Sequence, residues 1–380
     1  MSFGVYSFGS NRSGQLGVGH KEDLSSPAPC LFRETSSLGL TSWIQNDTVT
    51  KITAGGNHTL LLTRSGVVYA AGNNENGRCG FKNGLTQSAS FECVDLSLLP
   101  DSAQSSAKIT DIAATWEASL LVVDGRHVYA CGSGSKGELG LGSEKQEAPQ
   151  MVKVFGLDSS TNHDASIVHI SASVNHIVLL TSTGVMYGWG SCRKGQLGGG
   201  TKSQQVLWRP RIIEAPFIPR QLVTGRGFTF LLGRDSDQIL FGEIQEAQSL
   251  PLELAHDEDV ICSGWSTVYG LSRGHVQGIG RNDRGQRPPN KLPAIRQLAA
   301  GSEHCLGLTT SGDVVAWGWG EHGNCGVPVD HRGNVVDRWN HIVLPLAHPA
   351  TVDRVEAGCA TSFVVVLQDR TPGSEDGAEI

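Results

Sequence analysis

The stretch AGGNHTLLLTRSGVVYAAG, residues 54–72, contains both halves of the pattern that decides the fold. It begins with a turn of small residues, continues through the apolar run 60–62, turns at residues 63–66, and returns through residues 67–71 to Gly72. Two short apolar runs on either side of a tight, glycine-containing turn predict a β-hairpin.

The two half-patterns recur along the whole chain. A short β-like run that ends in glycine occurs seven times, closing at Gly9, Gly72, Gly132, Gly190, Gly242, Gly280 and Gly318. The small-residue turn also occurs seven times, beginning at Ala54, Ala114, Ala172, Thr224, Ser263, Ala300 and Ala357. Repetition at this spacing predicts a β-propeller in which each repeat is one antiparallel blade. The closing glycines are about 60 residues apart early in the chain and 38 apart after Gly242, so the fifth and sixth blades are expected to be trimmed.

The order of the half-patterns predicts how the ring closes. The chain begins with the glycine-ended run alone and ends with the turn alone, which is followed by the apolar run 363–367. The two ends are therefore expected to complete one blade, which removes the exposed edges of an open array. We expect an all-β fold, a single seven-bladed β-propeller over residues 1–367 closed by the two terminal strands, with residues 368–380 a disordered polar tail.

Composition limits the possible partners. The net charge is -7 and acidic and basic residues are mixed, so direct nucleic-acid binding is not expected. There is no signal-peptide pattern and no apolar stretch of about 20 residues, so no membrane association is expected. Nine cysteines without a Cys-x-x-Cys pair fit reduced thiols in the cytoplasm, or also in the nucleus, and predict neither a metal site nor a cofactor.

A longer version of the repeat identifies a family resemblance. The run VYSFGSN at 5–11, followed by GQLG at 14–17, is echoed by GELG at 137–140 and GQLG at 195–198. These motifs resemble the regulator of chromosome condensation repeat, and the resemblance extends over residues 5–367. The segments GSEH at 301–304, WGWGEHGNCG at 317–326 and GCAT at 358–361 are similar to a fungal branch of that family, the α-tubulin suppressors or killer-toxin-insensitivity proteins.

The resemblance to this fungal branch implies a function and a partner. It implies a heterodimer with the small CSL-type zinc-finger protein that carries iron and donates electrons in diphthamide synthesis on elongation factor two. It also implies support of Elongator-dependent modification of wobble uridines in tRNA, with the Elongator complex as a further partner. Both roles are regulatory, and the resemblance brings no catalytic residue with it.

The sequence contains no catalytic motif of a familiar enzyme class. It has no Gly-x-Ser-x-Gly elbow, no P-loop and no His-Glu-x-x-His, which favours a non-enzymatic binding protein. The alternative is guanine-nucleotide exchange on a small GTPase, the activity of the family's founder. Exchange needs an inserted wedge, and residues 81–108 and 143–166 are long enough to contain one.

Strand direction places both glycine-rich signatures on one face of the ring, where loops are the usual place for recognition. On that face, His58, His176 and His304 follow the repeat pattern, so we expect each to hydrogen-bond within its own blade. Positions that depart from the pattern are better candidates for binding a partner.

Six departures are candidate partner-binding residues. They are Trp116 and Trp265 in the second and fifth turns, Arg226 in the fourth turn, and Trp319, Glu321 and His322 beyond the last closing glycine. Tryptophan is enriched at interface hot spots, and arginine suits an acidic partner. The alternatives are that the indoles pack under neighbouring loops and that Arg226 forms an ion pair between blades.

Overall fold

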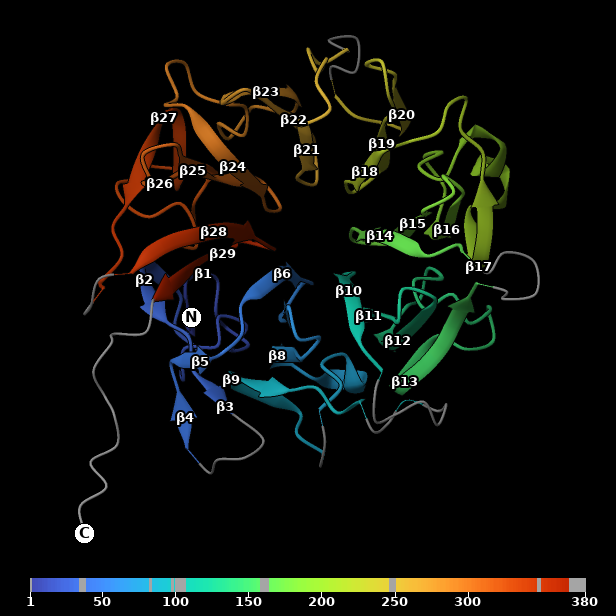
Figure 1. Ribbon diagram of the computed structural model, residues 1–380, viewed down its shortest axis with the longest axis horizontal. Helices are drawn as coiled ribbons and strands as arrows, with labels where there is room; N and C mark the ends of the chain where they lie inside the picture. The colour runs from blue at the N-terminus through green and yellow to red at the C-terminus, as the bar shows by residue number, and fades with distance from the viewer. Residues whose placement is uncertain are drawn as a thin grey trace.

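The computed structural model is a ring of seven β-sheets around a central axis (Figure 1). It describes residues 2–33, 39–81, 84–96, 99, 107–157, 164–245, 251–346 and 350–368. The innermost strands of blades 1 to 7 are β28 (Thr351–Ala357), β6 (Val49–Ala54), β10 (Ile109–Ala114), β14 (Ile167–Ala172), β18 (Gln221–Thr224), β21 (Val260–Ser263) and β24 (Ile295–Ala300). The predicted seven-bladed propeller is therefore confirmed.

Each blade continues outward from its inner strand. Blades 2, 3, 4 and 7 have three further strands in order: β7 (His58–Thr63), β8 (Val68–Asn73) and β9 (Gln87–Cys93); β11 (Ala118–Val123), β12 (His127–Ser133) and β13 (Glu147–Gly156); β15 (His176–Thr181), β16 (Met186–Ser191) and β17 (Val206–Ile213); and β25 (His304–Thr309), β26 (Val314–Trp319) and β27 (Asn334–Ile342). The hairpin β3 (Phe32–Arg33) and β4 (Leu40–Thr41) extends blade 2, because β3 pairs with β9. Short 3-10 helices, η1 (Glu75–Gly77) and η3 (Gly199–Gln204), lie in the loops after β8 and β16.

Blade 1 is built from both ends of the chain, as predicted. Strand β1 (Ser2–Gly9) pairs along its full length with β29 (Thr361–Gln368), from Ser2 opposite Gln368 to Gly9 opposite Thr361. On its other side β1 pairs with β2 (Leu24–Pro29) and β5 (Trp43–Gln45). The ring therefore closes inside a sheet. Residues 369–380, most of the predicted tail, lie outside the described residues.

Within the described residues, blades 5 and 6 have three strands each, so the prediction that they are trimmed is confirmed. They continue from β18 with β19 (Phe228–Leu232) and β20 (Gln238–Gly242), and from β21 with β22 (Thr267–Ser272) and β23 (His275–Gly280). The side chain of Gln238 donates to and accepts from the backbone of Leu252, at 2.8 and 2.9 Å. Gln277 accepts from the backbone N–H of Glu253 at 2.9 Å. Two glutamine amides therefore hold a segment beside the outer strands.

The hydrophobic core lies in the seams between neighbouring blades. The second strands β7, β11, β15 and β25 are buried at every residue, because both faces of a blade pack against neighbouring blades. In one seam, Leu60 and Leu62 of blade 2 pack with Leu121 and Val123 of blade 3. Free Cys131 is buried in the same seam, where it packs as a small apolar side chain, and burial raises the pKa of its thiol to about 12.

The seven closing glycines share one backbone conformation. Their φ angles lie between 95° and 118°, a region that L side chains rarely adopt. The residue after each glycine donates its N–H to a carbonyl of the turn before the second strand, for example Asn73 to Asn57 at 2.8 Å and Ser133 to Glu117 at 2.9 Å. A Cβ at Gly132 would lie 2.3 Å from that same Glu117 oxygen. The bond occurs in all seven blades and places both signatures on one face, as predicted.

The three repeat-pattern histidines join neighbouring blades, so the prediction that each bonds within its own blade was wrong. Their Nε2 atoms lie 3.0 to 3.1 Å from a hydroxyl of the next blade, in the pairs His58–Ser119, His176–Thr229 and His304–Ser362. Burial and the nearby Arg78 charge lower the pKa of His58 to about 3, and burial lowers the pKa of His176 and His304 to about 4. All three rings are therefore neutral near pH 7.

Substituting Gly132 with alanine is expected to destabilise the propeller by about 2 kcal/mol or more, because the new Cβ needs an unfavourable φ and meets a backbone oxygen. The matched control is Gly200→Ala, where no atom lies within 4 Å of the new Cβ. Urea unfolding should show a change of less than about 0.5 kcal/mol for the control. Equal stability of the two variants would contradict the structural role of the closing glycine.

Replacing His304 with glutamine is expected to reduce the dependence of stability on pH. The histidines gain a proton near pH 6.5 in the unfolded chain but only at about pH 4 or below in the folded protein. The free energy of unfolding therefore falls as the pH drops from about 6.5 toward 4, by up to about 1.4 kcal/mol per pH unit for each histidine. Urea titrations across this window should give a shallower slope for His304→Gln than for the wild type.

The control for this experiment is His275→Gln, at an exposed position. Other titrating groups contribute equally to the wild type and the variants, so the comparison cancels them. One such group is Glu356: burial raises its pKa to about 7, and its contribution to stability changes with pH in the opposite direction. If the dependence of the free energy of unfolding on pH changes equally in both variants, the buried His304 is not the cause of that dependence.

Candidate functional site

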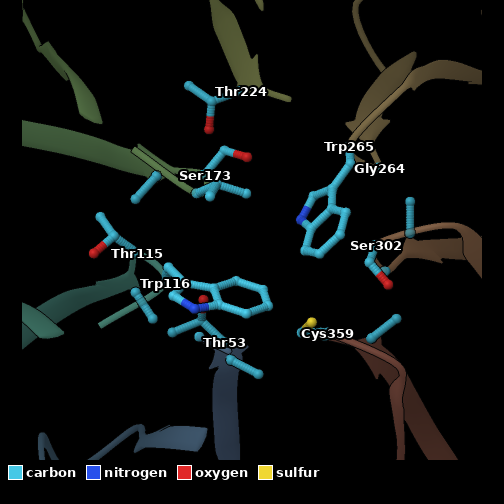
Figure 2. Close-up of a pocket in the computed structure, with 18 of the residues that line it drawn as sticks. Thr53, Thr115, Trp116, Ser173, Thr224, Gly264, Trp265, Ser302 and Cys359 are labelled. Carbon is cyan, nitrogen blue, oxygen red and sulfur yellow. The ribbon is translucent and has the colours of Figure 1, made fainter. Parts of the chain in front are cut away.

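The seven small-residue turns surround a cavity at the loop-bearing end of the central channel. The cavity has a volume of about 140 Å³, and residues from all seven turns line it. Figure 2 shows Thr115, Ser173, Thr224, Ser302 and Cys359 around its wall, with the indoles of Trp116 and Trp265 directed into it. We call this cavity the channel mouth.

Backbone hydrogen bonds between neighbouring blades hold the channel mouth. In four pairs of neighbouring turns, the third residue of one turn donates its N–H to the carbonyl of the third residue of the next, as in Gly56 to Trp116 at 2.9 Å and Arg226 to Trp265 at 2.8 Å. In a fifth pair, Ser302 donates to the second residue of the next turn, Gly358, at 3.0 Å. Within each turn, the second residue donates to the carbonyl of the fifth in all seven blades. Since these bonds use only the backbone, the third side chain is free to vary while its position stays fixed.

The two channel-mouth tryptophans contact each other across the ring. Trp116 belongs to blade 3 and Trp265 to blade 6, and their ring centroids are 5.7 Å apart at an interplanar angle of 52°. Trp116 also covers Gly56 of the neighbouring turn, and yet 39% of its surface is exposed. The indole therefore packs on a neighbouring turn, as one interpretation of Trp116 expects, and because part of it is exposed to solvent, its role at an interface stays a prediction.

Arg226 lies beside this pair. Its guanidinium carbon is 5.9 Å from the centroid of the Trp265 ring, and the side chain is exposed. Arg226 forms no ion pair with any other residue that the structure describes, so the alternative of an ion pair between blades was wrong for this part of the chain. The cation is supported by an indole face instead.

Trp319, the last residue of β26, forms a second cluster with Glu321 and His322 of the loop that follows. The Trp319 indole donates to a Glu321 carboxylate oxygen at 3.1 Å and meets the His322 ring edge-on at 5.3 Å. The guanidinium carbon of Arg284, in blade 6, lies over the Trp319 ring at 5.1 Å from its centroid, and His322 Nδ1 lies 2.8 Å from Asp23 of blade 1. This cluster therefore spans blades 6, 7 and 1.

The structure thus divides the six candidate residues into two groups. Trp116, Trp265 and Arg226 line or flank the channel mouth, whereas Trp319, Glu321 and His322 lie at the end of β26 and in the loop after it. Glu303 connects the groups, because its carbonyl accepts from Trp319 N–H at 2.9 Å and its carboxylate accepts from Ser266, beside Trp265, at 2.7 Å. All six lie on the same face, and their role in binding a partner stays a prediction.

Sequence reasoning missed Arg284 and Asp23 as members of the outer cluster. Arg284 lies in the loop RNDRGQ, which follows the repeat pattern, so nothing in the local sequence distinguishes it. Its contact with Trp319 joins two blades, and such contacts are visible only once the blades are placed side by side.

The opposite half of the channel contains charges that pair with one another. Inner-strand residues there line a cavity of about 520 Å³ that shares Thr53, Ala172, Thr224 and Ser263 with the channel mouth. Lys51 Nζ lies 2.7 Å from Asp111, and His169 lies 3.5 Å from the same carboxylate. Burial opposes ionisation of Asp111, but the Lys51 ammonium and the His169 ring outweigh it and hold the carboxyl pKa below its usual range.

The two long stretches that could contain a wedge for nucleotide exchange mostly form the outer strands of blades. Residues 81–108 contain β9, and residues 143–166 contain β13. Residues 82–83, 97–98, 100–106 and 158–163 of these stretches lie outside the described residues. Within the described ranges, no three His, Cys, Asp or Glu side chains are grouped to hold a metal ion. None of the helices that are described has the length and apolar character needed to cross a bilayer.

Comparisons with known proteins agree with this architecture. A family model described as an RCC1-like domain matches residues 4–366. An RCC1 repeat-containing protein of Schizosaccharomyces pombe is 32% identical, covering 96% of this chain and 99% of that protein. A secretion-regulating guanine nucleotide exchange factor of Bos taurus is 25% identical, covering 88% of this chain and 77% of that protein. The solved structure of Prp20p from Saccharomyces cerevisiae has the same fold, with a TM-score of 0.77 at 19% identity over 97% of this chain and 92% of that one.

A double-mutant cycle of Trp116→Ala and Trp265→Ala is expected to give a coupling energy of about 0.5–1.5 kcal/mol in the free energy of unfolding, because the two rings are in contact. The control cycle pairs Trp116→Ala with Trp319→Ala, whose rings make no recorded contact among the described residues. That cycle should be additive within about 0.5 kcal/mol. Additivity in both cycles would mean that the indoles do not touch in solution.

Proposed function

Since this chain belongs to the RCC1-like family, we propose that it is a non-enzymatic binding protein whose loop face holds a partner protein. The observation that carries this proposal is the channel mouth, where a hydrogen-bonded set of turns presents Trp116, Trp265 and Arg226. Large rigid side chains held on a fixed backbone lose little entropy on binding, which is typical of interface hot spots.

The proposed partner is the small CSL-type zinc-finger protein that carries iron and donates electrons in diphthamide synthesis. The support is the similarity of the segment WGWGEHGNCG, residues 317–326, to the fungal branch for which that heterodimer is implied. The same segment contributes Trp319, Glu321 and His322 to the outer cluster. In this proposal the propeller regulates the carrier, and so supports both diphthamide synthesis and Elongator-dependent wobble-uridine modification, in the cytoplasm and also the nucleus.

Guanine-nucleotide exchange on a small GTPase is the second candidate function. It is favoured by the 25% identical relative from Bos taurus, which is named a secretion-regulating guanine nucleotide exchange factor. The loop face would serve this activity as well, since exchange also begins with binding of a protein partner.

An affinity pulldown with the tagged full chain is expected to recover the small CSL-type zinc-finger protein from a fungal extract. The variant Trp265→Ala/Trp319→Ala should lose at least about 90% of the recovered partner, because hot-spot truncations cost about 2 kcal/mol or more each. The control is Trp208→Ala, a half-buried indole on the outer strand β17.

Two outcomes would overturn the proposal. One is absence of the zinc-finger protein from the pulldown together with faster nucleotide release from a small GTPase when the chain is added. The other is full recovery of the partner by a folded Trp265→Ala/Trp319→Ala variant, which would show that another face binds it.

A further inference from the structure

A sector of the loop face carries five basic side chains, among which the exposed carboxylates of Glu243 and Asp283 also lie, paired with Lys202 and Arg281. Arg193 and Lys194 follow β16 in blade 4, Arg226 is in the turn of blade 5, and Arg281 and Arg284 follow β23 in blade 6. We call these five residues the basic arc. Its charge is opposite in sign to the net charge of the chain, which is -7. The arc is therefore a local feature, which the overall charge does not predict.

Contacts between blades make the basic arc continuous. The side chain of Lys194 lies against Gly227, next to Arg226, since a Cβ at Gly227 would lie 2.7 Å from its Cδ. Arg226 stacks on Trp265, and Arg281 donates its N–H to Ser266, the residue after Trp265, at 3.1 Å. Arg284 then stacks on Trp319. The arc thus runs from blade 4 to the outer cluster and passes the channel mouth.

Most of the charge in the basic arc is not neutralised within the chain. Arg281 is paired with Asp283 at 2.6 Å. Arg193, Lys194, Arg226 and Arg284 form no salt bridge with any residue in the described part of the chain. An arginine that stacks on an indole keeps its N–H groups available for carboxylates. Two such arginines lie along one arc, each beside a candidate tryptophan.

Carboxylates lie on both sides of the basic arc, and they favour a protein partner over a nucleic acid. Glu117, in the turn of blade 3, is half exposed, and Glu321 is exposed in blade 7. A nucleic-acid backbone that ran on past the arc would meet these negative charges. The indole faces also bear charge, because Arg226 lies over Trp265 and Arg284 lies over Trp319. The pattern favours a protein of complementary charge.

We propose that the basic arc recognises a carboxylate-rich segment of the partner protein, with an apolar side chain of that segment seated against Trp265 at the channel mouth. The inference rests on the proposed function, since it names the part of the loop face that the partner uses and the chemistry that it recognises. Charge attraction of this kind speeds association and weakens with salt.

Charge reversal in the full chain tests this inference. The double variant Arg193→Glu/Arg226→Glu is compared with Arg64→Glu/Arg234→Glu, which changes the charge equally at exposed hairpin positions on the opposite face. Fluorescence anisotropy measures binding of three probes: a labelled (Glu-Glu-Leu)5 peptide, a 15-nucleotide single-stranded RNA, and the recombinant CSL-type zinc-finger protein. The arc variant should bind the peptide and the zinc-finger protein at least about tenfold more weakly, and the control within about twofold of the wild type.

The outcomes separate the inference from the proposed function. Arc-dependent binding of the peptide without binding of the zinc-finger protein would support the inference and overturn the named partner. Tight binding of the zinc-finger protein that the arc variant leaves unchanged would overturn the inference alone. Arc-dependent binding of the RNA but not of the peptide would assign the arc to nucleic acid and overturn it too. Absence of binding to all three probes would overturn both.

Discussion

One backbone hydrogen bond, repeated in every blade, is the constraint on which the rest of the structure depends. It joins the residue after each closing glycine to a carbonyl of the turn that precedes the second strand. Only a residue without a Cβ fits the positive φ and the close carbonyl at that point. Because the bond joins the end of the third strand to the start of the second, both loops of each blade leave the sheet on the same side. The whole loop face is thereby set by seven copies of one local contact.

In the seven turns, the backbone and the side chains therefore have separate roles. The turns are held by main-chain bonds within and between blades, so the third turn position carries glycine, tryptophan, valine, arginine, serine or cysteine without loss of the turn. Trp116 and Trp265 are therefore substitutions that the fold tolerates and does not require. A propeller of this kind can acquire a binding surface by changing single residues on one face.

Local patterns in the sequence predict the fold because its constraints are local. The closing glycines, the hairpin turns and the split terminal blade each depend on residues that are close in sequence or on the order of two motifs. The wrong prediction concerned contacts between blades, since His304 bonds to Ser362 of the next sheet and not within its own. The contact between Trp116 and Trp265 joins blades 3 and 6, and the stacking of Arg284 on Trp319 joins blades 6 and 7. A repeat pattern carries no information on which variable residues will meet across the ring.

Closure of the ring by the two chain ends has a consequence for synthesis of the protein. Strand β1 is synthesised before blades 2 to 7, and its eight residues are all buried in the finished blade. Its long partner, β29, is synthesised after those blades. While blades 2 to 7 are being made, one edge of β1 therefore has no partner strand, and this segment is accessible to chaperones until β29 follows.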